Sequence, residues 1–259
     1  MTPGKSPSLT MLGTGTSMGV PMIGCDCAVC TSTDPHNHRY RSGVLLEAPG
    51  GNLLIDTSQE LRLQLIRAGV HQLSGVLYTH AHADHIMGLD DLRIFGFRQK
   101  GPIPLYCEEV VESAIRRTFS YAFLQSETLH SKPQLEFRRV AAEPLQVCGL
   151  NIQPIRLIHG TLPILGYRIG NVAFCTDVSH IPDESWGLLR DLDVLILGAI
   201  RHEPHPTHFS VGQALEVIAE LRPRKAYLTH ISHTLEHTET NRHLPDKVEL
   251  AYDGLRVML

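Results

Sequence analysis

The sequence predicts a four-layer αββα sandwich, in which two β-sheets pack face to face with helices on both outer sides. Two observations lead to this fold class. The chain contains two β-rich stretches, and segments with a helical pattern follow each of them. We also find no short-period repeat, low-complexity tract or linker in the 259 residues, so we predict a single domain over 1–259.

The first β-rich stretch begins with a short apolar strand at 9–12. Strands at 42–47 and 52–55 flank a Pro-Gly-Gly-Asn turn, which is the pattern of a hairpin. The elements that we predict next are an amphipathic helix at 59–68, a strand at 75–78, a helix at 88–97, a strand at 103–107 and a helix at 108–123.

The second β-rich stretch follows at 135–175. Its predicted strands are 135–140, 150–158, 165–169 and 172–175, and Gly170-Asn171 forms a two-residue hairpin turn between the last two. The remaining predicted elements are a helix at 182–192, a strand at 194–197, a helix at 210–221 with Ser210 as N-cap, a strand at 225–228 and a strand at 255–259.

The composition is that of an ordinary soluble globular chain, with 42% hydrophobic residues, 19% charged residues and a formal net charge of −4. There is no basic excess, so we expect no surface that coats nucleic acid. No apolar run approaches the roughly 18 residues of a membrane span. The first eight residues have no apolar signal-peptide core, so we expect a cytoplasmic protein.

Four residues with metal-binding side chains follow the predicted strand 75–78. An extended backbone points His80 and His82 the same way, whereas the adjacent Asp84 and His85 diverge unless the backbone turns. This geometry suits two metal ions side by side, with the first pair on one and the second pair on the other. A solvated loop is the alternative, because the chain has 16 histidines. The complete His-x-His-x-Asp-His pattern after an apolar strand favours the metal site.

Three later strands end in the same way, each just before a residue that can bind a metal. These residues are His159, Asp177 and His230. A single histidine or aspartate after a strand is more often a cap or turn residue. Three of them, in this order after the first motif, favour side chains that converge at one edge of a sheet.

The motif and the three later residues together resemble the metallo-β-lactamase superfamily of binuclear metallohydrolases, whose fold is the αββα sandwich. The resemblance covers nearly the whole chain. It implies a first metal ion bound by His80, His82 and His159, a second bound by Asp84, His85 and His230, and a bridge between them formed by Asp177. An aspartate at the bridge resembles the phosphodiesterase, ribonuclease and thioesterase branches.

The predicted ligands suit Zn or Mn, because both accept imidazole and carboxylate groups. Two such ions, about 3.5–4 Å apart, hold a hydroxide and stabilise the attacking and leaving oxygens of a phosphodiester. Metal-bound water has a pKa of roughly 7, so no side-chain base is needed. The leaving alkoxide still needs a proton or a positive partner.

His208 is our candidate for that partner, and we assign the catalytic roles to His208 and Asp84. In the phosphodiesterase and tRNA-processing branches, a histidine that is not a ligand precedes a helix and contacts the scissile phosphate. His208 resembles it, because the helix 210–221 starts two residues later. His202 and His205 in the same segment are alternatives, as is a solvated loop.

Three of the six cysteines, Cys25, Cys27 and Cys30, lie close together. The even number allows disulfides, but close thiols without a secretion signal favour a metal. A tetrahedral structural zinc needs a fourth ligand, and His233 is the candidate if the chain turns after His230. An exposed loop histidine is the alternative. The other cysteines, which we predict to be core residues, are Cys107, Cys148 and Cys175.

The Gly-Cys-x-Cys-x-x-Cys pattern, together with Leu-Thr-His-Ile-Ser-His around His230 and His233, closely resembles the PhnP-type cyclic phosphodiesterases of the carbon–phosphorus lyase pathway. The resemblance implies two active-site metal ions, one structural zinc, a small cyclic ribose or nucleotide phosphodiester as substrate, and a homodimer. A similar cysteine knuckle occurs in the pyrroloquinoline-quinone biosynthesis protein of this fold, so the knuckle alone does not fix the substrate.

Two other functions are weighed against this one. A tRNA 3′-processing endoribonuclease would carry a long flexible arm, which we do not find, and the acidic net charge disfavours a polyanion. A non-hydrolytic metal-binding accessory protein is disfavoured by the full set of seven ligands. The glycine-rich segment 13–19 could cradle a phosphate or form a turn beside the site. We expect the specificity pocket in loops such as 121–133.

Overall fold

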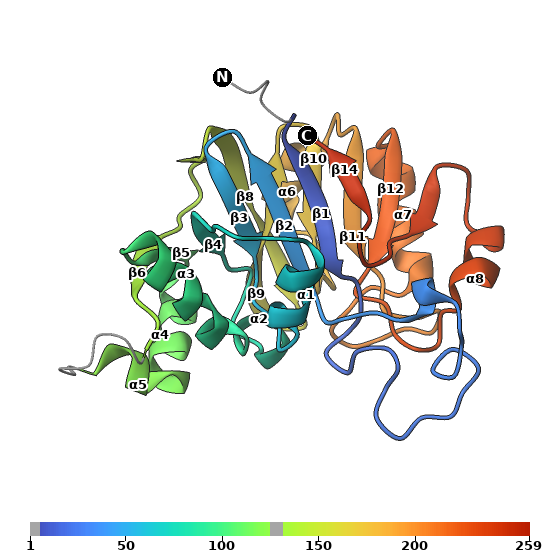
Figure 1. Cartoon of the computed structure of the whole chain (residues 1–259). Helices are drawn as coiled ribbons and strands as arrows, with labels where there is room; N and C mark the ends of the chain where they lie inside the picture. Colours follow the sequence, from blue (N-terminus) through green and yellow to red (C-terminus); the bar gives the residue numbers. More distant parts are fainter. Residues whose placement is uncertain (1–5, 125–131) are drawn as a thin grey trace.

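The computed structural model describes residues 6–124 and 132–259. It consists of two seven-stranded β-sheets that pack face to face, with helices on the outer side of each (Figure 1). The predicted αββα sandwich is therefore confirmed. The expected specificity loop at 121–133 lies partly outside the described residues.

The first sheet contains the N-terminal strands and the last strand of the chain. Its spatial order is β14 (Arg256–Met258), β1 (Ser8–Gly13), β2 (Gly43–Ala48), β3 (Gly51–Ile55), β4 (Gly75–Leu77), β5 (Ile103–Cys107) and β6 (Leu135–Arg139). Strands β3 to β6 run parallel to one another, because helices connect them, whereas β14, β1, β2 and β3 pair antiparallel.

The second sheet has the order β13 (Val248–Leu250), β12 (Lys225–Thr229), β11 (Val194–Gly198), β10 (Val172–Cys175), β9 (Leu162–Ile169), β8 (Leu150–His159) and β7 (Leu145–Val147). Strands β10 to β13 are parallel, and β7 to β10 are antiparallel. The Gly170-Asn171 turn joins β9 to β10 as predicted, with Gly170 at φ +58°.

Successive side chains of a strand point to opposite faces of its sheet, so alternate residues pack in the core between the sheets and in the layer under the helices. In β3, Leu53 and Ile55 face the second sheet, whereas Leu54 packs against the helices on the outer side. In β11, Ile196 lies in the same inter-sheet core, and its neighbours Leu195 and Leu197 face outward. Each sheet is thus buried on both faces, which explains why its central strands are apolar at nearly every position.

Among the described residues, five helices cover the first sheet. They are α1 (Leu61–Arg67), α2 (Ala83–Ile86), α3 (Arg93–Gln99), α4 (Glu109–Thr118) and α5 (Ser120–Phe123). Helices α6 (Asp183–Trp186) and α7 (Val211–Leu221) cover the second sheet, and α8 (His237–His243) contacts β13. The short 3₁₀ segments are η1 (Pro35–Asn37), η2 (Leu89–Leu92) and η3 (Gly187–Leu189).

Several predicted elements have different limits. The helix predicted at 108–123 breaks at Phe119 (φ −109°, ψ 42°), where the side chain is buried and the chain changes direction. The helix predicted at 182–192 is only α6 followed by η3. Helix α8 was not predicted, because it is polar throughout, and the three-residue strands β7 and β13 were not predicted either.

The three scattered cysteines differ in their surroundings. Cys107 and Cys175 are buried in the apolar clusters as predicted. Cys148 is only half-buried, because it occupies the β7–β8 turn with φ +53°. Its prediction as a core residue was therefore only partly right.

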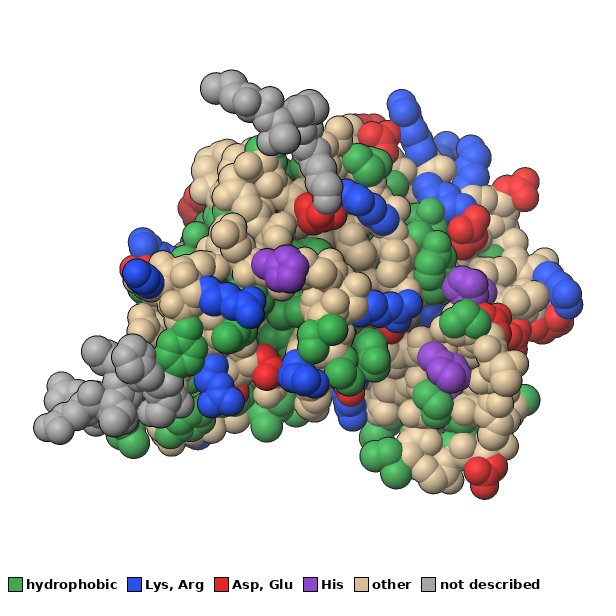
Figure 2. All heavy atoms as spheres, in the orientation of Figure 1, with side chains coloured by type: hydrophobic (Ala, Val, Ile, Leu, Met, Phe, Trp, Pro, Cys, Tyr) green, Lys and Arg blue, Asp and Glu red, His purple; other side chains and the backbone are tan. Residues whose placement is uncertain are grey.

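The described surface carries both signs of charge. Figure 2 shows acidic and basic side chains interspersed on one face of the molecule. Within residues 6–124 and 132–259, no helix combines the length and the apolar character needed to cross a membrane.

The first prediction concerns the start of α7. Ser210 caps this helix as predicted: its Oγ accepts from the Gln213 backbone N–H (3.3 Å), and Gln213 Oε1 accepts from the Ser210 N–H (2.9 Å). Ser210→Ala should therefore lower the free energy of unfolding by about 1 kcal/mol in a denaturant titration. Glu216→Ala, on the exposed face of the same helix, is the control and should change it by less than about 0.5 kcal/mol. Equal values for the two variants would contradict the capping role.

Candidate metal centre

The ends of strands from both sheets meet at one edge of the sandwich. Asp56 follows β3 and His80 follows β4 in the first sheet. In the second sheet, His159 is the last residue of β8, Asp177 lies just after β10, and His230 follows β12. Strands β8 and β10 run the same way, since each is antiparallel to β9, so their ends lie at the same edge.

The structure brings all seven predicted ligands together at this edge, in two adjacent groups. The first group is His80, His82 and His159, and the second is Asp84, His85, Asp177 and His230. Within each group the potential ligand atoms lie within 4.8 Å of one another. This is the division between two metal ions that the family resemblance implied.

Asp177 lies between the two groups. Its Oδ2 is 4.0 Å from His80 Nε2 in the first group. Its Oδ1 is 3.4 Å from His85 Nε2 and 3.2 Å from His230 Nδ1 in the second. One carboxylate thus faces both groups, which is the arrangement that a bridging ligand needs.

The short helix α2 provides the turn that the sequence required between neighbouring ligands. His82 is its N-cap residue, and Asp84 and His85 lie in its single turn. His80 thus precedes the helix in an extended segment, while Asp84 and His85 point into the second group. His82 is exposed, whereas the other six residues are buried.

Three residues that end strands have a left-handed backbone conformation. These are Asp56 (φ +63°), Asp177 (φ +54°) and His230 (φ +57°). Such values are uncommon outside glycine and cost free energy, although aspartate and histidine tolerate them better than most residues. Strained residues of this kind cluster at functional sites, where the surrounding structure holds them in place.

Asp56 orients histidines of both groups, and the sequence analysis did not assign it a role. Its Oδ2 accepts from His85 Nδ1–H at 2.7 Å and from the Thr79 hydroxyl at 2.8 Å. Because the hydroxyl proton of Thr79 is used there, Thr79 Oγ1 accepts from His80 Nδ1–H at 2.9 Å. One buried carboxylate therefore turns Nε2 of both His80 and His85 toward the centre of the cluster.

A backbone carbonyl orients His159 in the same way. Its Nδ1–H donates to the Thr207 carbonyl at 2.6 Å, which leaves Nε2 for a metal. The sequence did contain a signal for Asp56, since it follows a buried strand just as Asp177 and His230 do. It was missed because it stands alone and is not part of a cluster.

The unpaired polar atoms of the site fit a cation. Seven buried side-chain nitrogen and oxygen atoms have no hydrogen-bond partner within the described ranges. Four of them belong to the predicted ligands: His80 Nε2, Asp84 Oδ2, His85 Nε2 and His230 Nδ1. Buried polar atoms almost always have a hydrogen-bond partner. Four unpaired atoms in one place therefore require an explanation, such as a bound ion. Imidazole nitrogens and carboxylate oxygens are the donors that zinc and manganese accept.

The electrostatics of the site also suit a cation. Burial disfavours a charge on His85, but Asp84, Asp177 and Asp56 outweigh it and raise its pKa well above the usual value. Burial likewise disfavours ionised Asp177, yet His230 and His85 hold the pKa of this carboxyl well below its usual range. The Asp177 carboxylate therefore stays negative, and positive charge beside it stabilises this form.

His208 lies next to the cluster and is half-buried. Its ring centroid is 4.5 Å from that of His159 and 4.8 Å from that of His230. Burial and the neighbouring His230 lower its pKa to about 3. The His205 ring contacts the His208 ring, with 5.0 Å between the two centroids. His202 is exposed and has no ring contact with the described site residues. Of the three candidates, His208 is the one that the structure places at the site.

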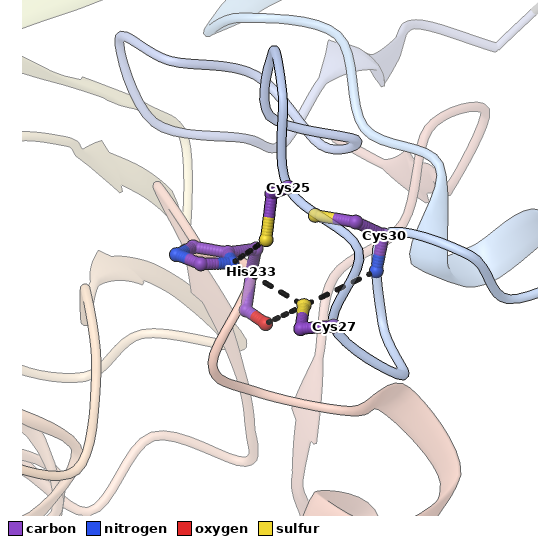
Figure 3. Close-up of side chains that lie close together, drawn as sticks. All are labelled: Cys25, Cys27, Cys30 and His233. Carbon is purple, nitrogen blue, oxygen red and sulfur yellow. Dashed lines mark hydrogen bonds between the residues drawn. The ribbon is translucent and has the colours of Figure 1, made fainter.

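His233 reaches the cysteine knuckle as predicted (Figure 3). His233 Nδ1 is 3.3 Å from Cys25 Sγ and 3.4 Å from Cys27 Sγ. The ligand atoms of these residues and of Cys30 lie within 4.8 Å of one another. The Cys30 backbone N–H and the His233 side chain lower the pKa of Cys27 to about 6, which favours the thiolate that zinc binds.

The glycine-rich segment 13–19 forms a turn whose amides are mostly used inside the protein. The Gly15 N–H donates to the Tyr40 carbonyl at 2.8 Å, and the Thr16 N–H donates to the Ile231 carbonyl at 3.3 Å. A Cβ on Gly13 would lie 1.9 Å from the Arg41 carbonyl oxygen, so only glycine fits this close approach. These contacts favour the turn over a phosphate cradle.

Comparison with known proteins agrees with this geometry. A sequence profile described as "Beta-lactamase superfamily domain" matches residues 51–231. A crystal structure described as a new diphosphatase from the PhnP family superposes with a TM-score of 0.92 at 44% identity, and the match covers 98% of each chain. Zn²⁺-bound PqqB from Methylobacterium extorquens has a TM-score of 0.81 at 17% identity, over 97% of this chain and 100% of that one, which shows a shared fold alone.

A curated relative is longer than this chain. The octanoyltransferase of Porphyromonas gingivalis is 38% identical over 253 residues, which are 96% of this chain and 51% of the relative. The chain thus spans about half the length of that protein.

The fold and the clustered histidines and aspartates together define a protein of the metallo-β-lactamase fold with a candidate metal centre. The profile match and the 44% identity show that the chain belongs to the β-lactamase superfamily and, within it, to the PhnP family.

The orienting role of Asp56 generates a prediction. Asp56→Asn removes the acceptor charge that holds His85 and, through Thr79, His80. We expect metal affinity to fall by about 10–100-fold, measured by competition with a chelating dye. Asp246→Asn, at an exposed position, is the control. Unchanged affinity in Asp56→Asn would show that the ligands do not depend on this carboxylate.

The knuckle generates a second prediction. Cys27→Ser should remove one zinc per chain and lower the melting temperature, because a structural zinc contributes folding free energy. Zinc content is measured by atomic emission and melting by circular dichroism. Cys148→Ser, at a half-buried cysteine outside the knuckle, should keep the full zinc content. The zinc assignment fails if Cys27→Ser also keeps it.

Proposed function

We propose that this protein is a binuclear-metal-dependent phosphodiesterase that hydrolyses a small cyclic ribose or nucleotide phosphodiester. The observation that carries the proposal is the pair of adjacent ligand groups with Asp177 between them. Zn or Mn ions held there would supply an acidified water and positive charge next to the phosphorus. We also propose one structural zinc on the cysteine knuckle and a homodimeric assembly.

The residues of the chain have separate tasks in this proposal. His80, His82 and His159 would hold one ion, and Asp84, His85 and His230 the other, with Asp177 touching both. Asp84, whose Oδ2 is buried without a hydrogen-bond partner among the described residues, is suited to orient the attacking water as well. Asp56 orients His80 and His85 and so would hold the two ions in fixed positions. This matters because a misplaced ligand displaces the reacting groups.

His208 would act on the leaving group. It is half-buried, its ring lies beside His159 and His230, and its ring nitrogens come within 4.8 Å of the ligand atoms of His159 and Asp177. A neutral imidazole there donates an N–H hydrogen bond to a phosphate oxygen or to the departing alkoxide, and this stabilises the charge that develops as the ester bond breaks.

The comparisons support phosphate chemistry more than acyl transfer. The PhnP-family structure matched over 98% of both chains is described as a diphosphatase, and hydrolysis of a diphosphate is also an attack of water on phosphorus. The name octanoyltransferase belongs to a relative of which 51% is matched, so it does not assign acyl transfer to this half. The net charge of −4 still disfavours a nucleic-acid substrate.

The test is hydrolysis of bis-p-nitrophenyl phosphate by the protein loaded with Mn²⁺ or Zn²⁺. We expect turnover well above that of the metal alone. Absence of turnover with both ion sites filled would reject the proposed function, and with it the tRNA-processing alternative.

The roles of individual residues are separated by two variants. His208→Ala should keep its metal but lower kcat by about 10²–10³-fold, because it removes a hydrogen-bond donor to the developing charge. Asp177→Ala should lose metal as well as activity. His71→Ala, at an exposed histidine, is the control for both metal content and kcat. Full activity of Asp177→Ala would contradict the bridge.

A further inference from the structure

A cavity of about 310 Å³ opens between the segments that flank the cysteine knuckle, the end of helix α1 and the turn before β14. None of the seven predicted active-site ligands is among the residues that line it, so it is separate from the candidate metal centre. Its volume lies within the range of small-molecule sites in proteins. The residues used below are Val20, Pro21, Pro35, Arg39, Arg67 and Asp253.

Arg39 is a buried cation in the wall of this cavity, with 2% of its surface exposed. Its terminal nitrogens donate to the Thr14 hydroxyl at 2.9 Å, to the Ala251 carbonyl and to His237 Nδ1 at 3.1 Å. Burial and the charge of Arg39 lower the pKa of His237 to about 4, so this imidazole is a neutral acceptor. Within the described ranges, Arg39 Nε has no partner, and none of the hydrogen bonds of this side chain goes to a carboxylate.

The charge of Arg39 is therefore only partly balanced. Burial lowers the pKa of its guanidinium to about 10, and three carboxylates that do not touch it raise the pKa without offsetting this effect: Asp253, Asp34 and Glu236. The oxygens of Asp253 already accept from the backbone N–H groups of Thr14 and Tyr40. A buried charge without a close opposite charge costs free energy. An anion in the cavity would lower that cost.

Arg67, the last residue of α1, supplies a second guanidinium. Its side chain is exposed, and the hydrogen bond described for it runs from Nη2 to the Asp253 carbonyl at 3.3 Å. The other N–H groups are left for a ligand. The cavity of about 370 Å³ between α1 and α3 differs, because its arginines are all exposed and it has no buried cation among its described lining residues.

We propose that this cavity binds the phosphate group of a small phosphorylated molecule, at a site separate from the metal centre. Arg67 donates to the phosphate oxygens from the rim, in the forked geometry that suits phosphate. Arg39 attracts the anion from the inner wall, where water screens its charge little. The apolar side chains of Val20, Pro21 and Pro35 contact the rest of the molecule.

Charge and size both favour a phosphorylated organic molecule. A phosphate monoester carries close to two negative charges near neutral pH, which match two guanidinium groups better than a carboxylate does. One water molecule accounts for about 30 Å³ of liquid, so a phosphate ion alone fills only part of a cavity of about 310 Å³. The remaining space suits an organic group of about the size of a pentose.

The experiment is an NMR titration of the zinc-loaded protein with ribose 5-phosphate, inorganic phosphate or ribose. The backbone amides of Tyr40 and Arg67 are the reporters, because they belong to residues that line this cavity and not to the metal centre. We expect ribose 5-phosphate to shift both amides to saturation, inorganic phosphate to bind more weakly, and ribose to shift neither amide.

Two variants test the role of the exposed guanidinium. Arg67→Gln should raise the Kd of ribose 5-phosphate about tenfold, because it removes a charged donor whose exposure limits its contribution. Arg62→Gln changes another exposed arginine of α1, one that does not line this cavity, and should leave the Kd unchanged. Circular-dichroism melting shows whether both variants keep the fold.

Three results would overturn the inference: no shift of either amide with ribose 5-phosphate, the same Kd in folded Arg67→Gln and the unaltered protein, or equal binding of ribose and ribose 5-phosphate. Equal Kd values for inorganic phosphate and ribose 5-phosphate would reject the organic part of the ligand. The measurement is binding at Tyr40 and Arg67, so its outcome does not depend on turnover at the metal centre.

Discussion

Three carboxylates buried at one edge of the sandwich set the main constraint on this structure. Asp56, Asp84 and Asp177 are all at most 5% exposed, and burial of unpaired charge costs several kcal/mol per group. Imidazoles offset part of this cost, as the 2.7 Å contact between Asp56 and His85 Nδ1 shows. The remaining donors and acceptors face one another without hydrogen bonds. A pair of cations would satisfy them, so the charge pattern and the ligand geometry point to the same conclusion.

Burial of apolar side chains in and around the two sheets offsets the free-energy cost of these buried charges. The inter-sheet core contains side chains from both sheets, among them Met11, Phe174 and Ile196, and the outer faces are covered by separate apolar clusters. The strand topology determines where the clustered side chains lie. Because β3 and β4 run parallel, and β8, β10 and β12 share one direction, five strand ends reach one edge with their last side chains directed into the same space. A few ligands from distant segments can therefore meet without a long loop.

Most of the site could be predicted from the sequence because its signal is local. A histidine or aspartate after an apolar strand is visible in the primary structure, and this pattern identified His159, Asp177 and His230. The His-x-His-x-Asp-His motif supplied the other four residues, and the family resemblance joined the seven into one ligand set. Asp56 carries the same signal but lacks neighbours of its kind, and its importance comes from the hydrogen bonds to His85 and Thr79, which only the folded chain shows. The arrangement of His202, His205 and His208 could not be derived either, because it depends on how the loop before α7 packs against His159.

The elements that the sequence missed share a physical reason. Helix α8 has no apolar face, so its periodicity gives no signal, and it is held by a side-chain cap from Glu236 and by contacts with β13. The break between α4 and α5 at Phe119 arises because a buried aromatic side chain follows a helix that would otherwise continue. In both cases tertiary packing decides a boundary that local propensity leaves open.

The link between the knuckle and the metal centre follows from a short segment after β12. His230 has a left-handed backbone and points into the second ligand group, whereas His233 faces the cysteines. Between them, Ile231 is fully buried and pairs with the turn at Gly15: its N–H donates to the Thr14 carbonyl at 2.8 Å.

Side-chain hydrogen bonds hold the turn at Thr14 and Gly15 in place. The Thr14 hydroxyl donates to Asp253 at 2.7 Å and accepts from the buried Arg39 at 2.9 Å. The chain continues from this turn directly into the cysteines, so the knuckle and the turn hold the segment around Ile231 from two sides. Rotation of His230 away from the centre would have to break the pairing at Ile231 or pull His233 off the cysteines. The contact of His233 with the cysteines and the pairing at Ile231 thus both restrict the position of His230, a predicted metal ligand.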